Sequence, residues 1–143
     1  MTVYLLDVSA LLAIHDHGHV HHQRAIDWFG RIRAGGWTTY PITENGFIRI
    51  ASNPKYPRLE GGPDVLARLL EETCETGAHE FWADTLPPRS VFREDLSLTF
   101  NQLTDLYLVS LTIQYGGKLA TLDERIPAQV IPGGVDALEV IPS

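Results

Sequence analysis

The sequence contains a single cysteine, Cys74, so it cannot form an internal disulfide. It has no apolar run close to the roughly 18 residues that span a bilayer, and its first residues lack the positively charged segment that opens a secretory signal peptide. These absences exclude a disulfide-stabilised secreted module and favour a reducing compartment. We therefore expect a cytoplasmic protein with no membrane partner.

Positive charge is also scarce. The chain has 11 Lys and Arg against 18 Asp and Glu, which gives a formal net charge of −7. This balance argues against a nucleic acid held on a broad basic surface. Divalent cations bound between carboxylates would offset part of the negative charge, however, so the charge alone leaves a nucleic-acid substrate open.

What the sequence does contain is an alternation of short apolar runs and helical patterns. It predicts strands at 3–6, 37–40, 80–83, 118–122 and 138–141, and helices at 9–14, 20–33, 44–51, 64–75 and 103–115. Thr43 is the expected N-cap of the third helix. The pattern predicts one α/β domain over residues 1–143, a three-layer sandwich whose mainly parallel central sheet has four to five strands flanked by helices.

Two of the predicted strands are followed by an aspartate. Asp7 ends the first in YLLDVS, and Asp123 ends the fourth in LATLDE, so parallel strands would bring both carboxylates to the same sheet edge. Glu44 and Asp105 lie near helix starts, where a carboxylate is stabilised without any functional role. Taken together, however, these acids would repel each other unless cations lie between them. Ligand sets of oxygen alone suit Mg²⁺ or Mn²⁺.

The acidic segments also resemble a known family. YLLDVSALLA, TENGFIRIASNP, LTDLYLVSL and LATLDERI resemble the successive acidic motifs of PIN-domain ribonucleases, and most closely those of VapC-type toxins of bacterial type II toxin–antitoxin systems. The resemblance covers nearly the whole chain. It implies a PIN-like fold and a Mg²⁺- or Mn²⁺-dependent endoribonuclease that hydrolyses structured RNA, such as tRNA or rRNA, with a metal-activated water. It also implies a homodimer and a small cognate antitoxin.

The same resemblance assigns roles to individual residues. Asp7, Glu44, Asp105 and Asp123 are the expected catalytic and metal-binding acids. Ser9 and Thr104 would be hydroxyls that orient Asp7 and Asp105. We prefer Asp123 to its neighbour Glu124 because Asp123 directly follows the apolar strand, and whether Glu124 shares its role stays open.

The segment HDHGHVHH holds five of the six histidines, between His15 and His22. Their spacings are mixed and Gly18 interrupts them, so one shared helical face is not expected. His19, His21 and His22 resemble an HxHH-like stretch found in several VapC-type toxins. We expect this segment to border the acidic cleft and, with Arg49, to supply contacts to RNA or to a partner. Arg89 and Arg93, in a long loop, are better explained as solvated charges.

Other classes of protein fit less well. A haloacid-dehalogenase-type phosphatase needs a second aspartate two places after Asp7, where this chain has Ser9. A receiver domain expects paired early acids and a late lysine, and a dinucleotide enzyme expects a glycine-rich turn that DVSALL lacks. Two non-enzymatic alternatives stay open: a catalytically silent PIN-like binding protein and a His-rich metal-binding or sensor protein.

Overall fold

The computed structural model describes residues 2–57, 59–92 and 98–143, so Arg93 lies outside the described residues. The strands are β1 (Tyr4–Leu6), β2 (Trp37–Thr39), β3 (His79–Phe81), β4 (Lys118–Thr121) and β5 (Leu138–Val140). The α-helices are α1 (Val8–His15), α2 (His22–Ile32), α3 (Pro41–Ala51), α4 (Pro63–Cys74) and α5 (Leu103–Tyr115). Short 3₁₀ turns occupy Arg33–Gly35, Pro88–Ser90, Phe100–Gln102 and Ala128–Val130. None of the helices in these described ranges is long and apolar enough to cross a bilayer.

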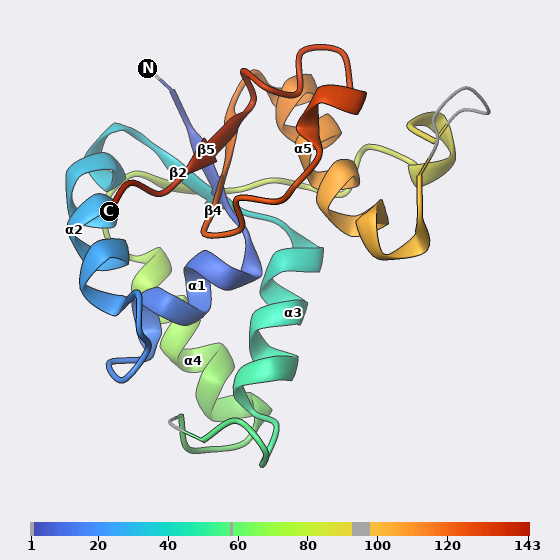
Figure 1. Ribbon diagram of the computed structural model, residues 1–143. Helices are drawn as coiled ribbons and strands as arrows, with labels where there is room; N and C mark the ends of the chain where they lie inside the picture. The colour runs from blue at the N-terminus through green and yellow to red at the C-terminus, as the bar shows by residue number, and fades with distance from the viewer. Residues whose placement is uncertain (1, 58, 93–97) are drawn as a thin grey trace.

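All five strands form one parallel sheet in the order β3-β2-β1-β4-β5 (Figure 1). The chain builds outward from β1 through β2 to β3, and then returns to place β4 on the other side of β1. The order therefore reverses between β1 and β4, where Leu6 pairs with Ala120. In open parallel sheets the crevice beyond the strand ends at such a reversal is a favoured ligand site.

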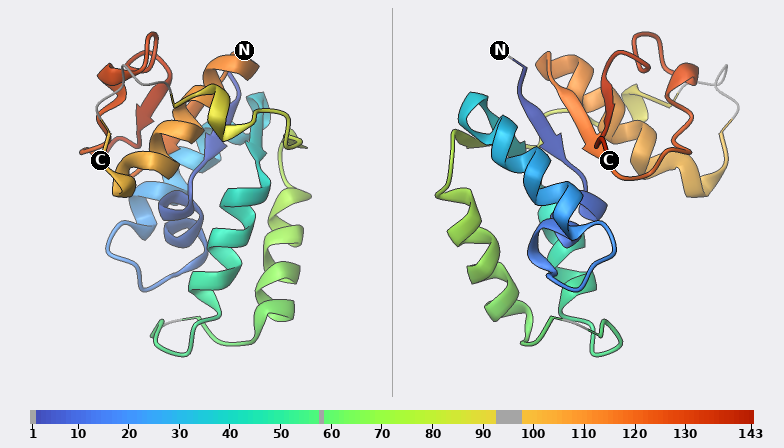
Figure 2. Two further views of the ribbon diagram at one scale, coloured as in Figure 1. Left: turned by 90° about the vertical axis from the view of Figure 1, so that its right-hand side faces the viewer. Right: turned by 60° about the vertical axis from the view of Figure 1, so that its left-hand side comes forward.

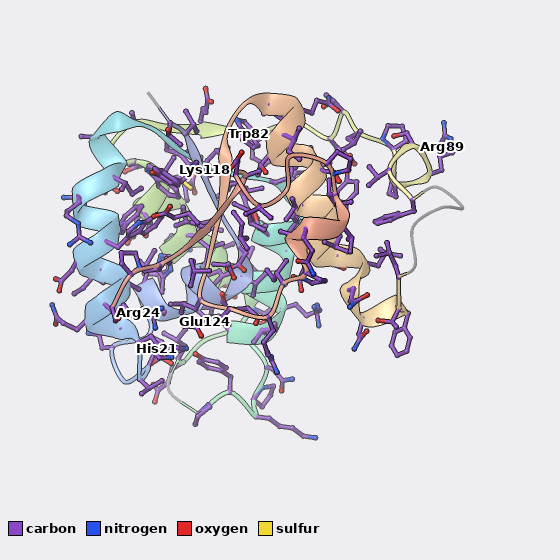
Figure 3. The ribbon with its side chains drawn as sticks, turned by 45° about the horizontal axis from the view of Figure 1, so that its top comes forward. His21, Arg24, Trp82, Arg89, Lys118 and Glu124 are labelled. Carbon is purple, nitrogen blue, oxygen red and sulfur yellow. The ribbon has the colours of Figure 1, made fainter. Side chains whose placement is uncertain are left out.

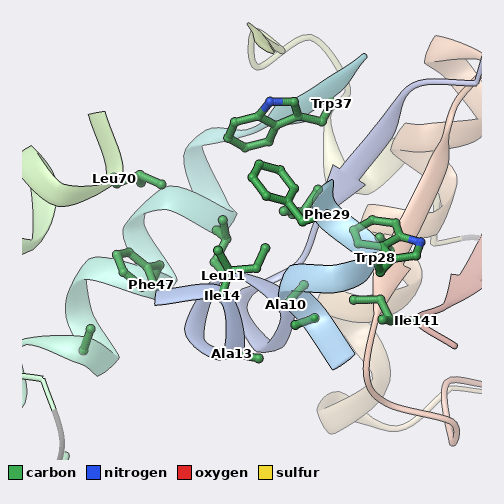
Figure 4. Packing of buried hydrophobic residues seen from close by; sticks show 14 of the residues in the cluster. Ala10, Leu11, Ala13, Ile14, Trp28, Phe29, Trp37, Phe47, Leu70 and Ile141 are labelled. Carbon is green, nitrogen blue, oxygen red and sulfur yellow. The ribbon is translucent and has the colours of Figure 1, made fainter. Parts of the chain in front are cut away.

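The sheet separates two hydrophobic cores, because successive strand residues point to opposite faces. Leu6 and Ala120 pack with apolar residues of α1, α2, α3 and α4 on one face, and Figure 4 shows part of this cluster around Trp37 and Phe29. Leu5 and Leu119 pack with α5 and with residues 126–137 on the other face. The result is the three-layer α/β sandwich that the sequence predicts.

Helix α3 begins earlier than the sequence suggests. Pro41 is its first residue and Tyr40 its N-cap, whereas the sequence pattern placed the cap at Thr43. At the first helical position a backbone N–H has no hydrogen-bond partner within the helix, so a proline, which lacks this N–H, loses nothing there. Its φ is also already helical. Pro41 therefore starts this helix and does not break the chain before it. Thr43 lies inside the first turn, where its hydroxyl accepts a hydrogen bond from the Tyr40 N–H at 3.1 Å.

The other boundaries shift by only one or two residues. Helix α2 begins at His22, and not at residue 20. Strand β4 ends at Thr121, so Asp123 lies two residues beyond the strand end and does not follow it directly.

A side-chain contact links α2 to the residue that follows β5. The Arg24 guanidinium donates two hydrogen bonds to the Ile141 carbonyl, 2.9 Å from Nε and 2.5 Å from Nη2.

Candidate active site

Asp7 is held rigidly at the junction of β1 and α1. It is the N-cap of α1, and its Oδ1 accepts hydrogen bonds from the Ala10 N–H at 3.0 Å and the Ser9 hydroxyl at 2.7 Å. Ser9 Oγ in turn accepts the Leu122 N–H at 3.2 Å, which ties the segment after β4 to the start of α1. The side chain is 8% exposed. Ser9 therefore contacts Asp7 as the resemblance implies.

Asp105 and Asp123 lie close enough to Asp7 for their charges to interact. Burial raises the pKa of Asp7, and the Asp123 charge adds to this, against hydrogen bonds from Ser9, Thr121 and Ala10 that lower it. Burial likewise raises the pKa of Asp105, followed by the charges of Asp7 and Asp123. These aspartates thus converge from β1, α5 and the segment after β4, at the point where the strand order reverses.

Within the described residues, the cation that contacts this group is an exposed arginine. Asp123 Oδ1 accepts hydrogen bonds from the Arg125 N–H at 2.9 Å and from its Nε at 3.2 Å. The Arg125 side chain is 91% exposed, and so exposed a cation neutralises a carboxylate only weakly. Thr121, whose hydroxyl assists Asp7, was not among the residues expected from the sequence, although it ends the strand beside Asp7.

The structure does not bring Glu44 to the three aspartates. Its carboxylate accepts a hydrogen bond from the Thr39 hydroxyl at 2.5 Å and lines a separate hollow with Cys74 and His79. Gly46 of α3 packs closely against the start of α1, since an added Cβ would lie 2.6 Å from Val8 Cγ2. Two residues correspond to roughly 200° around a helix, so Glu44 faces away from this contact. The order of the acidic motifs along the chain did not show on which face of α3 Glu44 lies.

The predicted contact between Thr104 and Asp105 is also not found. Thr104 is exposed, and no hydrogen bond joins it to Asp105, both of which lie in the described part of the chain. Thr104 instead lines a hollow of about 340 Å³ together with Val8, Asn45 and Arg49. This hollow adjoins the aspartates, because Val8 follows Asp7 and Thr104 precedes Asp105. Asn45 was missed, although its spacing of four residues from Arg49 places both on one helix face.

The histidines of the segment lie in different surroundings. His15 is buried, with its ring nitrogens 2.7 Å from the Leu11 carbonyl and the Thr73 hydroxyl, and His22 Nδ1 lies 2.7 Å from the Ala13 carbonyl. His19 and His21 line a hollow of about 480 Å³, whose other lining residues are Ser9, Leu122, Asp123, Glu124 and Arg125. Figure 3 shows His21 and Glu124 on this side of the molecule. The segment therefore borders the acidic cleft, as expected.

Comparison with known proteins adds an independent observation. The family model of the PIN domain matches residues 4–130. The chain is a PIN-domain protein. It is 35% identical to Ribonuclease VapC39 of Mycobacterium tuberculosis over 136 residues, which cover 94% of this chain and 98% of the relative. It is 38% identical to Ribonuclease VapC44 of the same organism over 135 residues, 90% of this chain and 92% of the relative.

These relatives place the chain in the VapC group of the PIN family, a family whose nucleases use divalent metal ions. Among solved structures, the crystal structure of PAE2754 from Pyrobaculum aerophilum is similar, with a TM-score of 0.57 and 20% identity over 96% of this chain and 83% of that chain. At this identity the likeness concerns the fold alone.

Proposed function

We propose that the protein is a divalent-metal-dependent endoribonuclease, the toxin of a VapC-type toxin–antitoxin pair, which hydrolyses phosphodiester bonds of structured RNA such as tRNA or rRNA. One observation carries the proposal: Asp7, Asp105 and Asp123 converge where the strand order reverses between β1 and β4. The names of the curated relatives, which are ribonucleases, agree with this reaction.

The donor chemistry of the three aspartates suits a hard divalent cation. They offer oxygen ligands alone, and burial and mutual repulsion raise the pKa values of Asp7 and Asp105. Cations between the carboxylates would relieve that repulsion, and a small all-oxygen set suits Mg²⁺ or Mn²⁺. When bound, such an ion makes a water more acidic and stabilises the developing negative charge on the departing oxygen. Asp7, Asp105 and Asp123 are the proposed ligands.

The chain's own residues hold this arrangement, and further side chains line two hollows next to it. Ser9 and the Ala10 amide fix the orientation of the Asp7 carboxylate. The hollow with His19 and His21 includes Asp123, and the hollow with Arg49 includes Val8 and Thr104, the chain neighbours of Asp7 and Asp105. We propose that these side chains contact the RNA backbone or a cognate antitoxin, and that the protein acts as a homodimer, as in the family it resembles.

Cleavage of structured RNA by the purified protein tests the proposal. We expect cleavage with Mg²⁺ or Mn²⁺, none with EDTA, and a loss of at least about 100-fold in rate in Asp7→Asn. Asp64→Asn is the matched control, since Asp64 is exposed in the first turn of α4, outside the aspartate group. Asp7→Asn cleaving as fast as Asp64→Asn would refute the site, and no cleavage with either metal would favour a silent PIN-like binding protein.

The variant Glu44→Gln tests whether the catalytic site contains three acidic residues or four. The position of Glu44 beside Thr39, Cys74 and His79 leads us to expect cleavage within a few fold of the wild-type rate. A loss comparable to that of Asp7→Asn would instead return Glu44 to the catalytic set.

A further inference from the structure

A second group of metal-ligating side chains lies away from the aspartates. Ligand atoms of Glu44, Cys74 and His79 all lie within 4.8 Å of one another, and each residue is half-buried. They come from α3, from the last residue of α4 and from β3, three parts of the fold that meet where α3 and α4 run side by side (Figure 2). The arrangement therefore depends on the folded chain and not on a local sequence motif.

This group faces an accessible hollow. The three residues line a space of about 340 Å³ with Ile48, Ala67, Leu70 and Glu71. Apolar residues form much of its wall, and Glu71 stands three positions before Cys74 on α4, a spacing that puts both on one helix face. A small ion can thus reach the group from solvent, and one further carboxylate is at hand.

Two of the three side chains are already positioned by hydrogen bonds. The Thr39 hydroxyl donates to Glu44 Oε2 at 2.5 Å and lies 2.9 Å from His79 Nε2. The His79 ring packs against Trp37 with centroids 4.5 Å apart, and strand pairing sets these two residues opposite each other. Because the Thr39 proton goes to Glu44, His79 Nε2–H donates to Thr39 and Nδ1 is left for an ion. A histidine oriented through its other ring nitrogen in this way binds a metal more tightly.

The donor types select the ion. A thiolate and an imidazole suit Zn²⁺ and related transition metals, whereas Mg²⁺ and Mn²⁺ prefer oxygen ligands alone. We propose that Glu44, Cys74 and His79 bind a divalent transition metal ion, Zn²⁺, at a site separate from the three aspartates. A fourth ligand, water or Glu71, would complete the tetrahedral set that zinc adopts. Binding would release the thiol proton to solvent and link α3, α4 and β3.

Cobalt substitution tests this proposal directly. Cys74 is the only cysteine, so a thiolate-to-Co²⁺ charge-transfer band can come from this site alone. We expect the reduced wild-type protein to give this band with one equivalent of Co²⁺, Zn²⁺ to abolish it, and excess Mg²⁺ to leave it unchanged. Cys74→Ser should lack the band, and His79→Ala should bind Co²⁺ at least about tenfold more weakly.

Matched variants distinguish the proposed site from other places where Co²⁺ could bind. Asp7→Asn should retain the band, because Asp7 is outside the group. Replacement of His19 and His21 by alanine should retain it as well. Absence of the band in the wild type, or Co²⁺ binding that disappears with these two histidines, would overturn the proposal. The readout is optical, so it is independent of RNA cleavage.

A second measurement avoids substitutions altogether. In the wild-type protein, Zn²⁺ should slow the reaction of Cys74 with a thiol reagent at least about tenfold, and a chelator should restore it. Equal labelling rates with and without Zn²⁺ would refute a thiolate ligand.

Discussion

At the scale of single residues, Asp7 combines burial with a charge that the folded chain compensates only in part. Its Oδ1 already accepts the Ser9 and Ala10 hydrogen bonds, and an asparagine oxygen can accept both. We therefore expect Asp7→Asn, in EDTA at pH 7, to raise the free energy of unfolding by about 0.5–2 kcal/mol above that of the wild type, although the same substitution removes the cleavage measured with Mg²⁺ or Mn²⁺. Urea unfolding measures the change.

The pH dependence of this gain has a definite sign. Burial raises the folded-state pKa of Asp7 above its ordinary value, so the folded protein binds the proton more tightly than the unfolded chain does. The stability contributed by protonated Asp7 is complete below the unfolded pKa of about 3.9 and is lost as pH rises through the folded pKa. The advantage of Asp7→Asn should therefore shrink towards pH 3. A constant difference from pH 3 to pH 7 would show that the charge is not the cause.

At the scale of elements, two helical glycines give opposite predictions for the same substitution. Alanine ordinarily stabilises a helix interior by about 0.5–1 kcal/mol over glycine. Gly30 in α2 has nothing within 4 Å of an added Cβ, so Gly30→Ala should stabilise by that amount. At Gly46 in α3 the Cβ would lie 2.6 Å from Val8 Cγ2, so Gly46→Ala should destabilise by about 1–3 kcal/mol. Thermal unfolding of both variants checks the pair, and equal effects would contradict the close α1–α3 contact.

The same helix explains why part of the site could not be predicted from the sequence. The pattern TENGF indicates a helix, and its buried residues Phe47 and Ala51 follow the expected spacing. Which of its polar residues faces the aspartates depends on the close approach at Gly46, a tertiary contact with no sequence signature. Motif order therefore suggested Glu44, whereas the contact turns Asn45 and Arg49 towards the hollow next to Asp7.

At the scale of the whole molecule, the alternating pattern was enough to predict a parallel α/β sandwich. Leu5, Leu6, Leu119 and Ala120 are fully buried, as expected of central parallel strands covered on both faces. The sequence was sufficient to predict that Asp7 and Asp123 lie at the same edge of the sheet, since both follow such strands. That β4 returns to pair with β1, and that α5 brings Asp105 to the same edge, are consequences of chain topology that the local pattern does not contain.

The net charge of −7 and the converging aspartates together predict how the molecule responds to magnesium. An ion that binds only the folded state stabilises it by about 2.7 kcal/mol at 100 times its Kd. For a chain of this size that corresponds to a rise in Tm of roughly 5–10 °C. KCl at matched ionic strength screens the overall charge without binding the aspartates, so it should give a smaller rise. Asp7→Asn should lose most of the magnesium-specific part, while Cys74→Ser should keep it. If KCl and MgCl₂ raise the Tm equally, or Asp7→Asn responds as the wild type does, magnesium acts by general screening and not through the three aspartates.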